Sequence, residues 1–264
     1  MEKVRQTESK SESLYWQSTG QGNDLVLLHG WGMNGAVWQQ TVETLSQHFC
    51  VHVVDLPGFG HSHQSYFDDM PHLAEQVLQH APEKAIWLGW SLGGLVATHI
   101  ALNHPQRVQK LITVASSPKF AAQRPWRGIQ PNVLSAFTEQ LVDDFQLTIE
   151  RFMALQAMGS PSARQDVKRL KKAVLSRPTP NPTSLLTGLQ LLADIDYRSE
   201  LENLAIPLLR LYGRLDGLVP VKVASDVDTL APSSNSFIFT ESSHAPFITE
   251  LETFCQQVHQ FITR

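Results

Sequence analysis

Hydrophobic and polar positions along this chain follow two patterns, short continuous apolar runs and longer stretches with helical spacing. Continuous apolar runs of four to six residues are typical of strands covered on both faces. The run at 25–28 is of this kind, and mainly apolar segments at 51–54, 85–88, 111–115, 207–212 and 236–239 are also expected to be strands, with an edge strand beginning at 14–16. Helical spacing fills the intervals at 38–48, 70–80 and 92–102. Strands alternating with helices predict an α/β fold, a mostly parallel sheet flanked by helices.

The pattern changes between residues 119 and 196, where no strand-like run occurs. Helical stretches separated by proline or glycine are expected there at 131–142, 143–158, 162–176 and 182–193. The strand pattern then resumes, and a final helix is predicted at 247–262. We therefore expect a flexible polar lead-in (1–13), a first core part (14–118), an inserted helical lid (119–196) and a second core part (197–264). Residues 119–196 are called the inserted segment below.

A serine stands at the tip of a glycine-rich turn between a predicted strand and a predicted helix. Residues 89–93, Gly-Trp-Ser-Leu-Gly, match the G-x-S-x-G pattern of a nucleophile elbow. A strand that reverses into a helix brings backbones too close for a Cβ and strains the serine, which explains the glycines. Ser91 is thus a candidate nucleophile. An ordinary strand-to-helix turn has the same features, so these five residues alone do not distinguish it from a nucleophile elbow.

Two later loops carry the partners that such a serine needs. Asp216 follows the predicted strand ending at Tyr212, and His244 follows the one ending at Phe239. A serine hydroxyl is a weak nucleophile, so histidine must take its proton, and a carboxylate must orient the histidine. The chain has 11 histidines, and an aspartate in such a turn is also a common cap. The order Ser, Asp, His, each after a strand, favours a catalytic triad.

Two backbone amides are expected to stabilise the oxyanion of a tetrahedral intermediate. One belongs to Leu92, directly after the nucleophile, and the other to Trp31, in the glycine-rich turn 29–32 after the first buried strand. Because only backbone groups are needed, the side chains of Trp31 and Trp90 are candidate walls of an acyl pocket. Tryptophans in such positions are also often part of the core.

Composition and charge exclude several classes of function. The chain has 264 residues, 42% of them hydrophobic, and a formal net charge of −4, which offers no overall positive charge for nucleic acid or an anionic membrane. Cys50 and Cys255 lie far apart, without metal-ligand spacing or a disulfide framework, and both are interpreted as reduced packing residues. His52, inside a strand, is interpreted as structural. No apolar stretch resembles a signal peptide or a membrane span. We expect a cytoplasmic, monomeric enzyme without metal or cofactor.

The inserted segment carries local positive charge in a chain that is acidic overall. Arg164, Lys168, Lys171 and Lys172 fall on one stripe of the predicted helix 162–176, and Arg151 lies on the preceding helix. Two interpretations remain open. The stripe is either a solvated helix face with local ion pairs or a surface that attracts an acidic macromolecule or anionic substrate.

Extended motifs resemble one family of α/β-hydrolases. They are HGWG (29–32), DLPGFG (55–60), WLGWSLGGL (87–95), TVASSP (113–118), RLYG (210–213), LDGLVP (215–220), HAPF (244–247) and, in the inserted segment, ERFMALQ (150–156). Together they resemble the pimeloyl-[acyl-carrier protein] methyl ester esterases of biotin synthesis. The resemblance covers nearly everything after residue 14. The WLGWSLGGL and ERFMALQ motifs are much more specific than G-x-S-x-G alone, which countless hydrolases share.

The resemblance implies hydrolysis of a carrier-bound pimeloyl methyl ester. Ser91 would be the nucleophile, His244 the general base and acid, and Asp216 its orienting partner, with an oxyanion hole from Trp31 and Leu92. The implied substrate-binding residues are Trp31, Ser91, Leu92, Phe152, Met153, Ala154, Leu155, Gln156 and His244. Arg151, Arg164 and Lys168 would face the acidic acyl-carrier protein. Leu147 departs from the pattern, because a further basic residue is expected one turn before Arg151.

Two other functions are compatible with the same residues. One is a broad hydrolase of small esters, lactones or C–C bonds, and the other is a ligand receptor on a hydrolase fold. Epoxide and haloalkane hydrolysis require a carboxylate at the elbow, so Ser91 argues against both.

Overall fold

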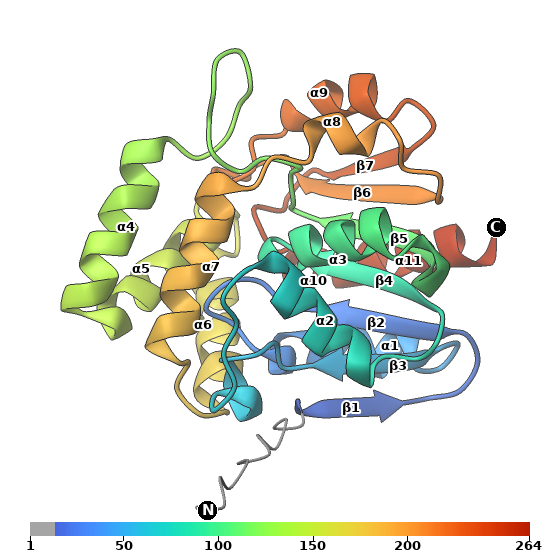
Figure 1. Cartoon of the computed structure of the whole chain (residues 1–264), viewed down its shortest axis with the longest axis horizontal. Helices are drawn as coiled ribbons and strands as arrows, with labels where there is room; N and C mark the ends of the chain where they lie inside the picture. The colour runs from blue at the N-terminus through green and yellow to red at the C-terminus, as the bar shows by residue number, and fades with distance from the viewer. Residues whose placement is uncertain (1–13) are drawn as a thin grey trace, which may run out of the picture.

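The computed structural model describes residues 14–264 (Figure 1), so the predicted lead-in at 1–13 lies outside the described residues. A seven-stranded sheet with the order β1-β3-β2-β4-β5-β6-β7 forms its centre. The strands are β1 Trp16–Thr19, β2 Asp24–Leu28, β3 Cys50–Val54, β4 Ala85–Trp90, β5 Val108–Val114, β6 Leu208–Gly213 and β7 Asn235–Phe239. Only β1 is antiparallel to its neighbour. The expected mostly parallel sheet with an N-terminal edge strand is confirmed.

The apolar runs at 25–28, 51–54, 85–88, 111–115 and 207–212 became buried strands, whereas the run at 236–239 became the edge strand β7, in which only Phe239 is buried. Every residue of β4 is buried, and β2 is buried from Leu25 onward. Side chains on both faces are covered by helices, which is why these strands do not alternate between apolar and polar residues. β4 pairs with β2 on one side and β5 on the other. The turn after β4 therefore lies at the centre of the sheet.

Helices cover both faces of the sheet (Figure 1). α2 and α3 lie on one face, where α3 contacts β4 and β5, while α1 and α11 contact each other on the other face. The helices of this core are α1 Gln39–Leu45, α2 Met70–His80, α3 Leu92–Asn103, α8 Arg198–Leu201, α9 Val223–Leu230, α10 Pro246–Thr249 and α11 Leu251–Thr263. Short 3-10 helices are η1 Gly35–Trp38, η2 Gly60–Ser62 and η3 Pro105–Arg107. No helix within residues 14–264 is long and apolar enough to cross a membrane.

The inserted segment forms four helices beside the carboxyl ends of the parallel strands (Figure 1). They are α4 Pro131–Asp143, α5 Phe145–Ala157, α6 Ala163–Leu175 and α7 Pro182–Asp194. Pro131 and Pro182 occupy first-turn positions, where a missing N–H costs no hydrogen bond. α5 packs against α4 and α6, and α6 reaches η1 and α10 of the core.

The C-terminal part differs from the expected single helix at 247–262. The chain forms α10 and then α11, with Glu250 between them in a non-helical conformation. The Glu250 carboxylate accepts hydrogen bonds from the Glu241 amide (3.0 Å) and the Ser242 hydroxyl (2.6 Å). These bonds tie the start of the helical region to the loop that carries His244. Periodicity alone does not reveal such a contact, because its partners lie in another element.

Candidate active site

Ser91 adopts the strained conformation expected of a residue at the tip of an elbow. Its φ is 55° and its ψ is −118°, in a region that non-glycine residues rarely occupy. Its amide donates to the Val114 carbonyl (2.9 Å), and its own carbonyl accepts from the Ser116 hydroxyl (2.9 Å). Both partners lie at or just after the end of the neighbouring strand β5. The sheet thus holds the strained turn from one side.

Close backbone contacts explain two glycines of the motif. A Cβ on Gly93 would lie 2.5 Å from the Leu28 carbonyl oxygen, and one on Gly89 would overlap the Gly93 carbonyl. A Cβ on Gly30, in the turn after β2, would lie 3.3 Å from the Ser91 Cβ. The glycine-rich turn and the elbow therefore lie directly against each other.

The two predicted partners of the serine lie together. His244 Nδ1 and Asp216 Oδ2 are 2.8 Å apart, and both side chains are almost completely buried. The other carboxylate oxygen, Asp216 Oδ1, accepts from the amides of Leu218 (2.8 Å) and Val219 (3.0 Å). These three hydrogen bonds engage both oxygens of the Asp216 carboxylate, so the orientation of the side chain is fixed. An Asp in this position holds the imidazole in one tautomer and stabilises its protonated form.

His244 is also held through its backbone. Its amide donates to the Gln156 carbonyl of α5 (3.0 Å), and its carbonyl accepts from the Trp90 indole (2.7 Å). Trp90 is the residue before Ser91, so one side chain connects the elbow to the histidine loop. Among the described residues, His244 Nε2 is buried without a hydrogen-bond partner, and Ser91 Oγ likewise forms no hydrogen bond to them. The candidate base and the candidate nucleophile are therefore not hydrogen-bonded to each other, and both atoms are available to a substrate.

The two predicted oxyanion amides are available as donors. Within residues 14–264, the amides of Trp31 and Leu92 donate to no protein acceptor. Leu92 begins α3, where the first amides of a helix have no intrahelical partner. The Trp31 indole is used elsewhere, as a donor to the Leu185 carbonyl of α7 (2.8 Å). The side chain therefore faces the inserted segment while the amide is free.

His29 fixes the turn that carries Trp31, a role that sequence reasoning missed. Its Nδ1 lies 2.9 Å from the Gly30 carbonyl, and its Nε2 accepts from the Leu56 amide (3.0 Å). The second bond requires an unprotonated Nε2. Complete burial lowers the pKa of His29 to about 4, although Asp55 opposes this shift. A neutral imidazole thus connects the loops that follow β2 and β3.

The expected acyl-binding residues of α5 differ in burial, because they lie on different sides of the helix. Phe152, Met153 and Gln156 are buried and Leu155 is half-buried. The Phe152 ring lies edge-on to the Trp31 indole, with centroids 4.8 Å apart. A Cβ on Gly188 of α7 would lie 2.7 Å from Trp31 Cδ1, so this glycine makes room for the indole.

Ala154 does not belong with these residues. It is exposed, because two positions along a helix correspond to a rotation of about 200° from Phe152 and from Gln156. The expectation that Ala154 lines the acyl chain therefore finds no support in the geometry. A run of five consecutive helical residues cannot all face one site.

Gln156 stands out among the buried residues. Both polar atoms of its side-chain amide are buried without a hydrogen-bond partner in the described part of the chain. Its backbone carbonyl binds the His244 amide, so this side chain projects from a point beside the candidate base. A buried amide without partners is costly, and such groups often mark a binding site. Phe152, one turn earlier, and Gln156 are therefore the residues of α5 that we expect to face the candidate site.

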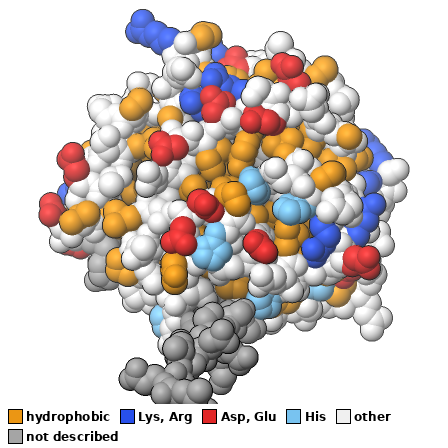
Figure 2. All heavy atoms as spheres, viewed as in Figure 1, with side chains coloured by type: hydrophobic (Ala, Val, Ile, Leu, Met, Phe, Trp, Pro, Cys, Tyr) orange, Lys and Arg blue, Asp and Glu red, His pale blue; other side chains and the backbone are white. Residues whose placement is uncertain are grey.

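The expected carrier-facing residues are exposed. Arg151, Arg164 and Lys168 all reach the surface, and none forms an ion pair within residues 14–264. Lys171, by contrast, pairs with Glu150 at 2.6 Å. Figure 2 shows that Lys and Arg do not gather over the face formed by α4 and α7, at the left, where apolar and acidic side chains prevail. Among the four helices of the inserted segment, Lys and Arg occur only in α5 and α6, and the other cations of the segment, Lys119, Arg124, Arg127 and Arg177, lie in its connecting stretches.

A buried ion pair attaches the inserted segment to the sheet, and sequence reasoning missed it. Arg177, after α6, pairs with Asp55 at the end of β3. The Asp55 carboxylate also accepts from the amides of Gly35 (2.7 Å) and His61 (2.7 Å). The DLPGFG motif contains Asp55, but its partner lies 122 positions away. Only a structure could identify the pair.

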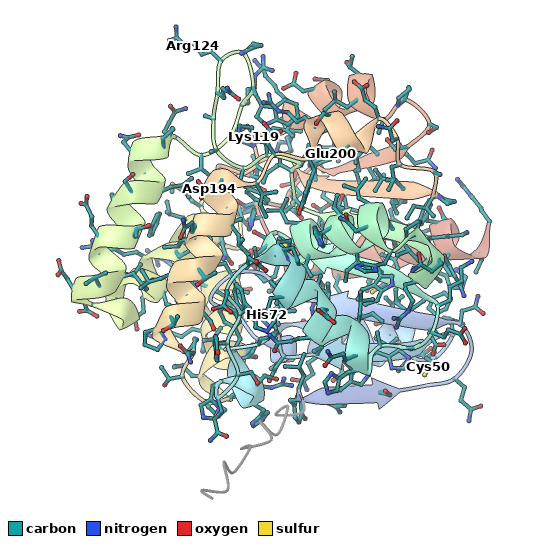
Figure 3. All side chains as sticks on the ribbon, viewed as in Figure 1. Cys50, His72, Lys119, Arg124, Asp194 and Glu200 are labelled. Atoms are coloured by element: carbon teal, nitrogen blue, oxygen red, sulfur yellow. The ribbon has the colours of Figure 1, made fainter. Side chains whose placement is uncertain are left out.

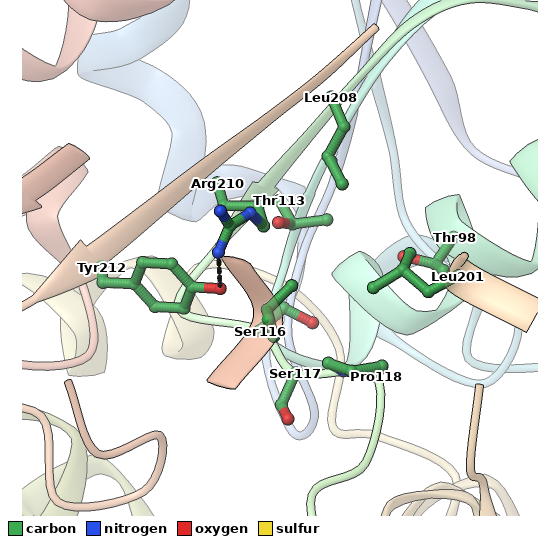
Figure 4. Close-up of a pocket in the computed structure, with 10 residues that line it drawn as sticks. Thr98, Thr113, Ser116, Ser117, Pro118, Leu201, Leu208, Arg210 and Tyr212 are labelled. Carbon is green, nitrogen blue, oxygen red and sulfur yellow. Dashed lines mark hydrogen bonds between the residues drawn. The ribbon is translucent and has the colours of Figure 1, made fainter. Parts of the chain in front are cut away.

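A small cavity lies behind the nucleophile (Figure 4). Its volume is about 20 Å³, and its lining includes Ser116, Thr98 and the buried pair Arg210 and Tyr212. This volume suits a single water molecule rather than a substrate. The cavity belongs to the support of the elbow, since Ser116 binds the Ser91 carbonyl.

Comparisons with known proteins agree with this arrangement. The sequence profile of the alpha/beta hydrolase fold matches residues 24–251. A Vibrio campbellii protein named pimeloyl-[acyl-carrier protein] methyl ester esterase is 73% identical over 95% of this chain and 99% of its own length. The protein of the same name from Vibrio cholerae is 69% identical over 96% and 99%.

Solved structures show the same fold at low identity. An esterase from Exiguobacterium antarcticum superposes with a TM-score of 0.84 at 23% identity, covering 95% of this chain and 96% of its own. An enol-lactonase from Burkholderia xenovorans gives a TM-score of 0.83 at 16% identity, with 95% and 96% covered. These two support the fold alone.

Proposed function

This chain belongs to the α/β-hydrolase family of pimeloyl-[acyl-carrier protein] methyl ester esterases, and we propose that it hydrolyses the methyl ester of a pimeloyl chain carried by acyl-carrier protein. The products are the carrier-bound pimeloyl acid and methanol, and the step ends chain elongation in biotin synthesis. One observation carries the chemistry: the loop with the buried His244–Asp216 pair is bonded through the Trp90 indole to the strained elbow that bears Ser91.

In the first step, Ser91 Oγ attacks the ester carbonyl carbon while His244 Nε2 takes its proton. The carbonyl oxygen becomes an oxyanion, which the amides of Trp31 and Leu92 stabilise by hydrogen bonds. Asp216 stabilises the imidazolium that forms. The C–OCH₃ bond then breaks, and His244 returns the proton to the methoxy oxygen. Methanol leaves, and the acyl chain remains as an ester of Ser91.

In the second step, water takes the place of methanol. His244 Nε2 removes a proton from the water as its oxygen attacks the acyl carbon, and the same two amides stabilise the new oxyanion. The bond to Ser91 Oγ breaks, and the imidazolium gives its proton to the serine. The product is a free carboxyl group, and Ser91 and His244 are regenerated.

The inserted segment supplies substrate recognition in this proposal. Phe152 and Met153 contact the methylene chain, and the Gln156 amide hydrogen-bonds a polar group of the substrate. The exposed cations Arg151, Arg164 and Lys168, called the docking stripe below, bind the acidic carrier. The carrier encounter should be accelerated at low salt, since exposed charges are screened over about 8 Å at physiological ionic strength. We further propose that the enzyme acts as a cytoplasmic monomer.

The central experiment is rescue of a biotin auxotroph that lacks this step. The wild-type chain should restore growth without biotin, and Ser91→Ala should not. In vitro, kcat/KM for the carrier-bound methyl ester should exceed that for the free methyl ester. Failure of rescue together with equal kcat/KM on both esters would replace the proposal with a broad small-ester hydrolase.

A further inference from the structure

A second cluster of chemically active side chains lies at the opposite end of the sheet from Ser91. Asp24 begins β2 and Cys50 begins β3, and the register of these parallel strands places the two residues opposite each other. His52 follows two positions after Cys50 and therefore shares its face. Figure 3 shows Cys50 at the end of the sheet away from the inserted segment.

The ligand atoms of these three residues lie close together. Asp24 carboxylate oxygen, Cys50 sulfur and His52 ring nitrogen all lie within 4.8 Å of one another. The distance between His52 Nε2 and Asp24 Oδ1 is 2.8 Å. In a tetrahedral zinc site, bond lengths of about 2.0 to 2.3 Å place neighbouring ligand atoms roughly 3.3 to 3.6 Å apart. Small side-chain rotations are enough to reach this spacing.

The other nitrogen of His52 already has hydrogen-bond partners that orient the ring. Nδ1 lies 2.7 Å from the Ser18 hydroxyl and accepts from the Trp16 indole at 3.2 Å. An indole can only donate, so the ring proton is on Nε2 and is directed at Asp24. When a cation binds Nε2, the ring proton moves to Nδ1, where the Ser18 oxygen can accept it. The Trp16 indole can only donate, so it must then give up its hydrogen bond to Nδ1. Such outer hydrogen bonds orient ligating imidazoles.

Access from solvent is also present. The side chain of Asp24 is 37% exposed, while that of His52 is 9% exposed. A cation can therefore reach the cluster past the carboxylate while the imidazole remains fixed against the sheet. A hydrogen bond between Asp24 and His52 would not involve Cys50, whereas cysteine sulfur, imidazole and carboxylate together are ligand types that zinc takes. On binding, the Cys50 thiol releases its proton to solvent, because the ligand is the thiolate.

We propose that Asp24, Cys50 and His52 bind a zinc ion, with water as the fourth ligand. The ion joins β2 to β3 and, through Ser18, fixes the edge strand β1. The role is structural, because the length of a five-residue strand, about 16 Å, separates this end of the sheet from the end that carries the elbow. The expectation that Cys50 is only a packing residue missed this cluster, because Asp24 is 26 positions away and strand pairing alone brings the two together.

Cobalt(II) is a direct probe of the proposed site. Added to the reduced full-length protein, it should produce a thiolate-to-cobalt charge-transfer band and the d–d bands of tetrahedral coordination, and one equivalent of zinc should abolish both. Cys50→Ser should lose the charge-transfer band. Cys255→Ser is the matched control and should retain it, because Cys255 is buried in α11. Absence of the band in the wild type, or its persistence in Cys50→Ser, would overturn the proposal.

Thermal unfolding tests the structural role independently of the spectrum. Zinc should raise the Tm of the wild type, and a chelator should reverse the increase, because a ligand bound only to the folded state stabilises it. Asp24→Asn should abolish the increase. Ser18→Ala keeps all three ligands and should weaken zinc affinity by about 10- to 100-fold. An equal Tm increase in the wild type and in Cys50→Ser would show that zinc binds elsewhere and would refute the site.

Discussion

At the scale of single residues, the candidate active site depends on a strained serine that its neighbours hold in place. A left-handed non-glycine residue costs roughly 1 to 3 kcal/mol. Two backbone hydrogen bonds to β5 and the loop after it, and the absence of side chains at Gly89 and Gly93, offset this cost at Ser91. The Ser91 side chain is buried at the tip of the elbow, and in the proposed mechanism the His244–Asp216 pair acts on its hydroxyl.

Replacing the nucleophile tests the chemistry directly. Ser91→Ala should reduce kcat by roughly 10⁴- to 10⁶-fold, since the triad acts as a unit, while the carrier-bound ester still binds. Asp216→Asn should reduce kcat by about 10⁴-fold, because the imidazole is then held in the wrong tautomer. Burst kinetics and the mass of an acyl-enzyme measure these effects. Substantial turnover by Ser91→Ala would remove Ser91 from the mechanism.

The elbow glycine Gly93 should tolerate no side chain. In Gly93→Ala, the new methyl group would meet the Leu28 carbonyl at 2.5 Å, and a backbone atom in the central sheet cannot move aside. We expect a loss of stability of at least about 1 to 3 kcal/mol and a loss of activity. Gly217→Ala is the matched control, because a Cβ there has no neighbour within 4 Å. Urea denaturation and ester hydrolysis, measured on both variants, should separate them clearly.

Substitution of Gln156 should affect catalysis without lowering the stability of the protein. Because both amide atoms are buried without partners in the described chain, Gln156→Leu should leave the free energy of unfolding unchanged or raise it. The same change should lower kcat/KM for the carrier-bound ester by roughly 10- to 100-fold, the effect of losing one or two hydrogen bonds to substrate. Ala154→Ser, on the exposed side of α5, should change neither quantity. A purely structural role would instead give a destabilised enzyme with normal kcat/KM.

At the scale of elements, the inserted segment has one face directed toward the candidate site and another exposed to solvent. α5 presents Phe152 and Gln156 inward and Arg151 outward, and α6 adds Arg164 and Lys168. The segment is anchored by the buried Arg177–Asp55 pair and by Asp166 of α6, whose carboxylate accepts from Thr249 of α10 at 3.1 Å. These attachments place the docking stripe at a defined position relative to the elbow.

Charge reversal on the docking stripe should affect only the carrier-bound substrate. The double change Arg151→Glu and Lys168→Glu should raise KM for that ester by about tenfold or more and spare p-nitrophenyl acetate, because exposed charges act on the acidic partner rather than on the chemistry. The increase should shrink as salt is added. Equal loss on both substrates would mean that these positions serve folding.

Leu147 offers the converse experiment. It is 39% exposed, one turn before Arg151 on α5, at the place where the family resemblance implies a basic residue. Leu147→Arg should therefore lower KM for the carrier-bound ester at low salt and leave kcat on small esters unchanged. Leu175→Arg, on the last turn of α6 and 65% exposed, serves as a control for added charge alone. A similar decrease in both variants would argue against a defined docking position.

At the scale of the whole molecule, burial of neutral histidines links stability to pH. His29 has a pKa of about 4 in the folded protein, lowered mainly by burial, against 6.5 when unfolded. Burial also lowers the pKa of His99. Because the pKa of His29 is lower in the folded state, the unfolded state binds more protons between pH 4 and 6.5. The contribution of the neutral imidazole to the free energy of unfolding is therefore fully present above pH 6.5 and is lost as the pH falls towards 4.

The pH dependence of unfolding tests this linkage. The free energy of unfolding of the wild type should decrease between pH 6.5 and 4, by up to about 1.4 kcal/mol per pH unit from His29. His29→Gln should flatten this slope, whatever its stability at pH 7, because glutamine does not titrate. Urea denaturation at several pH values measures both slopes. An unchanged slope in the variant would show that His29 is not the group responsible.

The sequence by itself determined the order of the strands and of the main helices, the elbow, and the candidates Ser91, Asp216 and His244, but it missed α8 and α9 and the break between α10 and α11. The predicted features follow from local rules, since apolar runs, glycine-rich turns and strand ends are visible within a few residues. Only the tertiary structure decided which groups meet across long separations: Asp216 with His244, Gln156 with the His244 amide, Arg177 with Asp55, and Asp24 with Cys50. It also excluded Ala154 from the buried side of α5. The physical reason is that contacts between distant residues depend on strand order, register and helix rotation, which the packing of the whole chain sets.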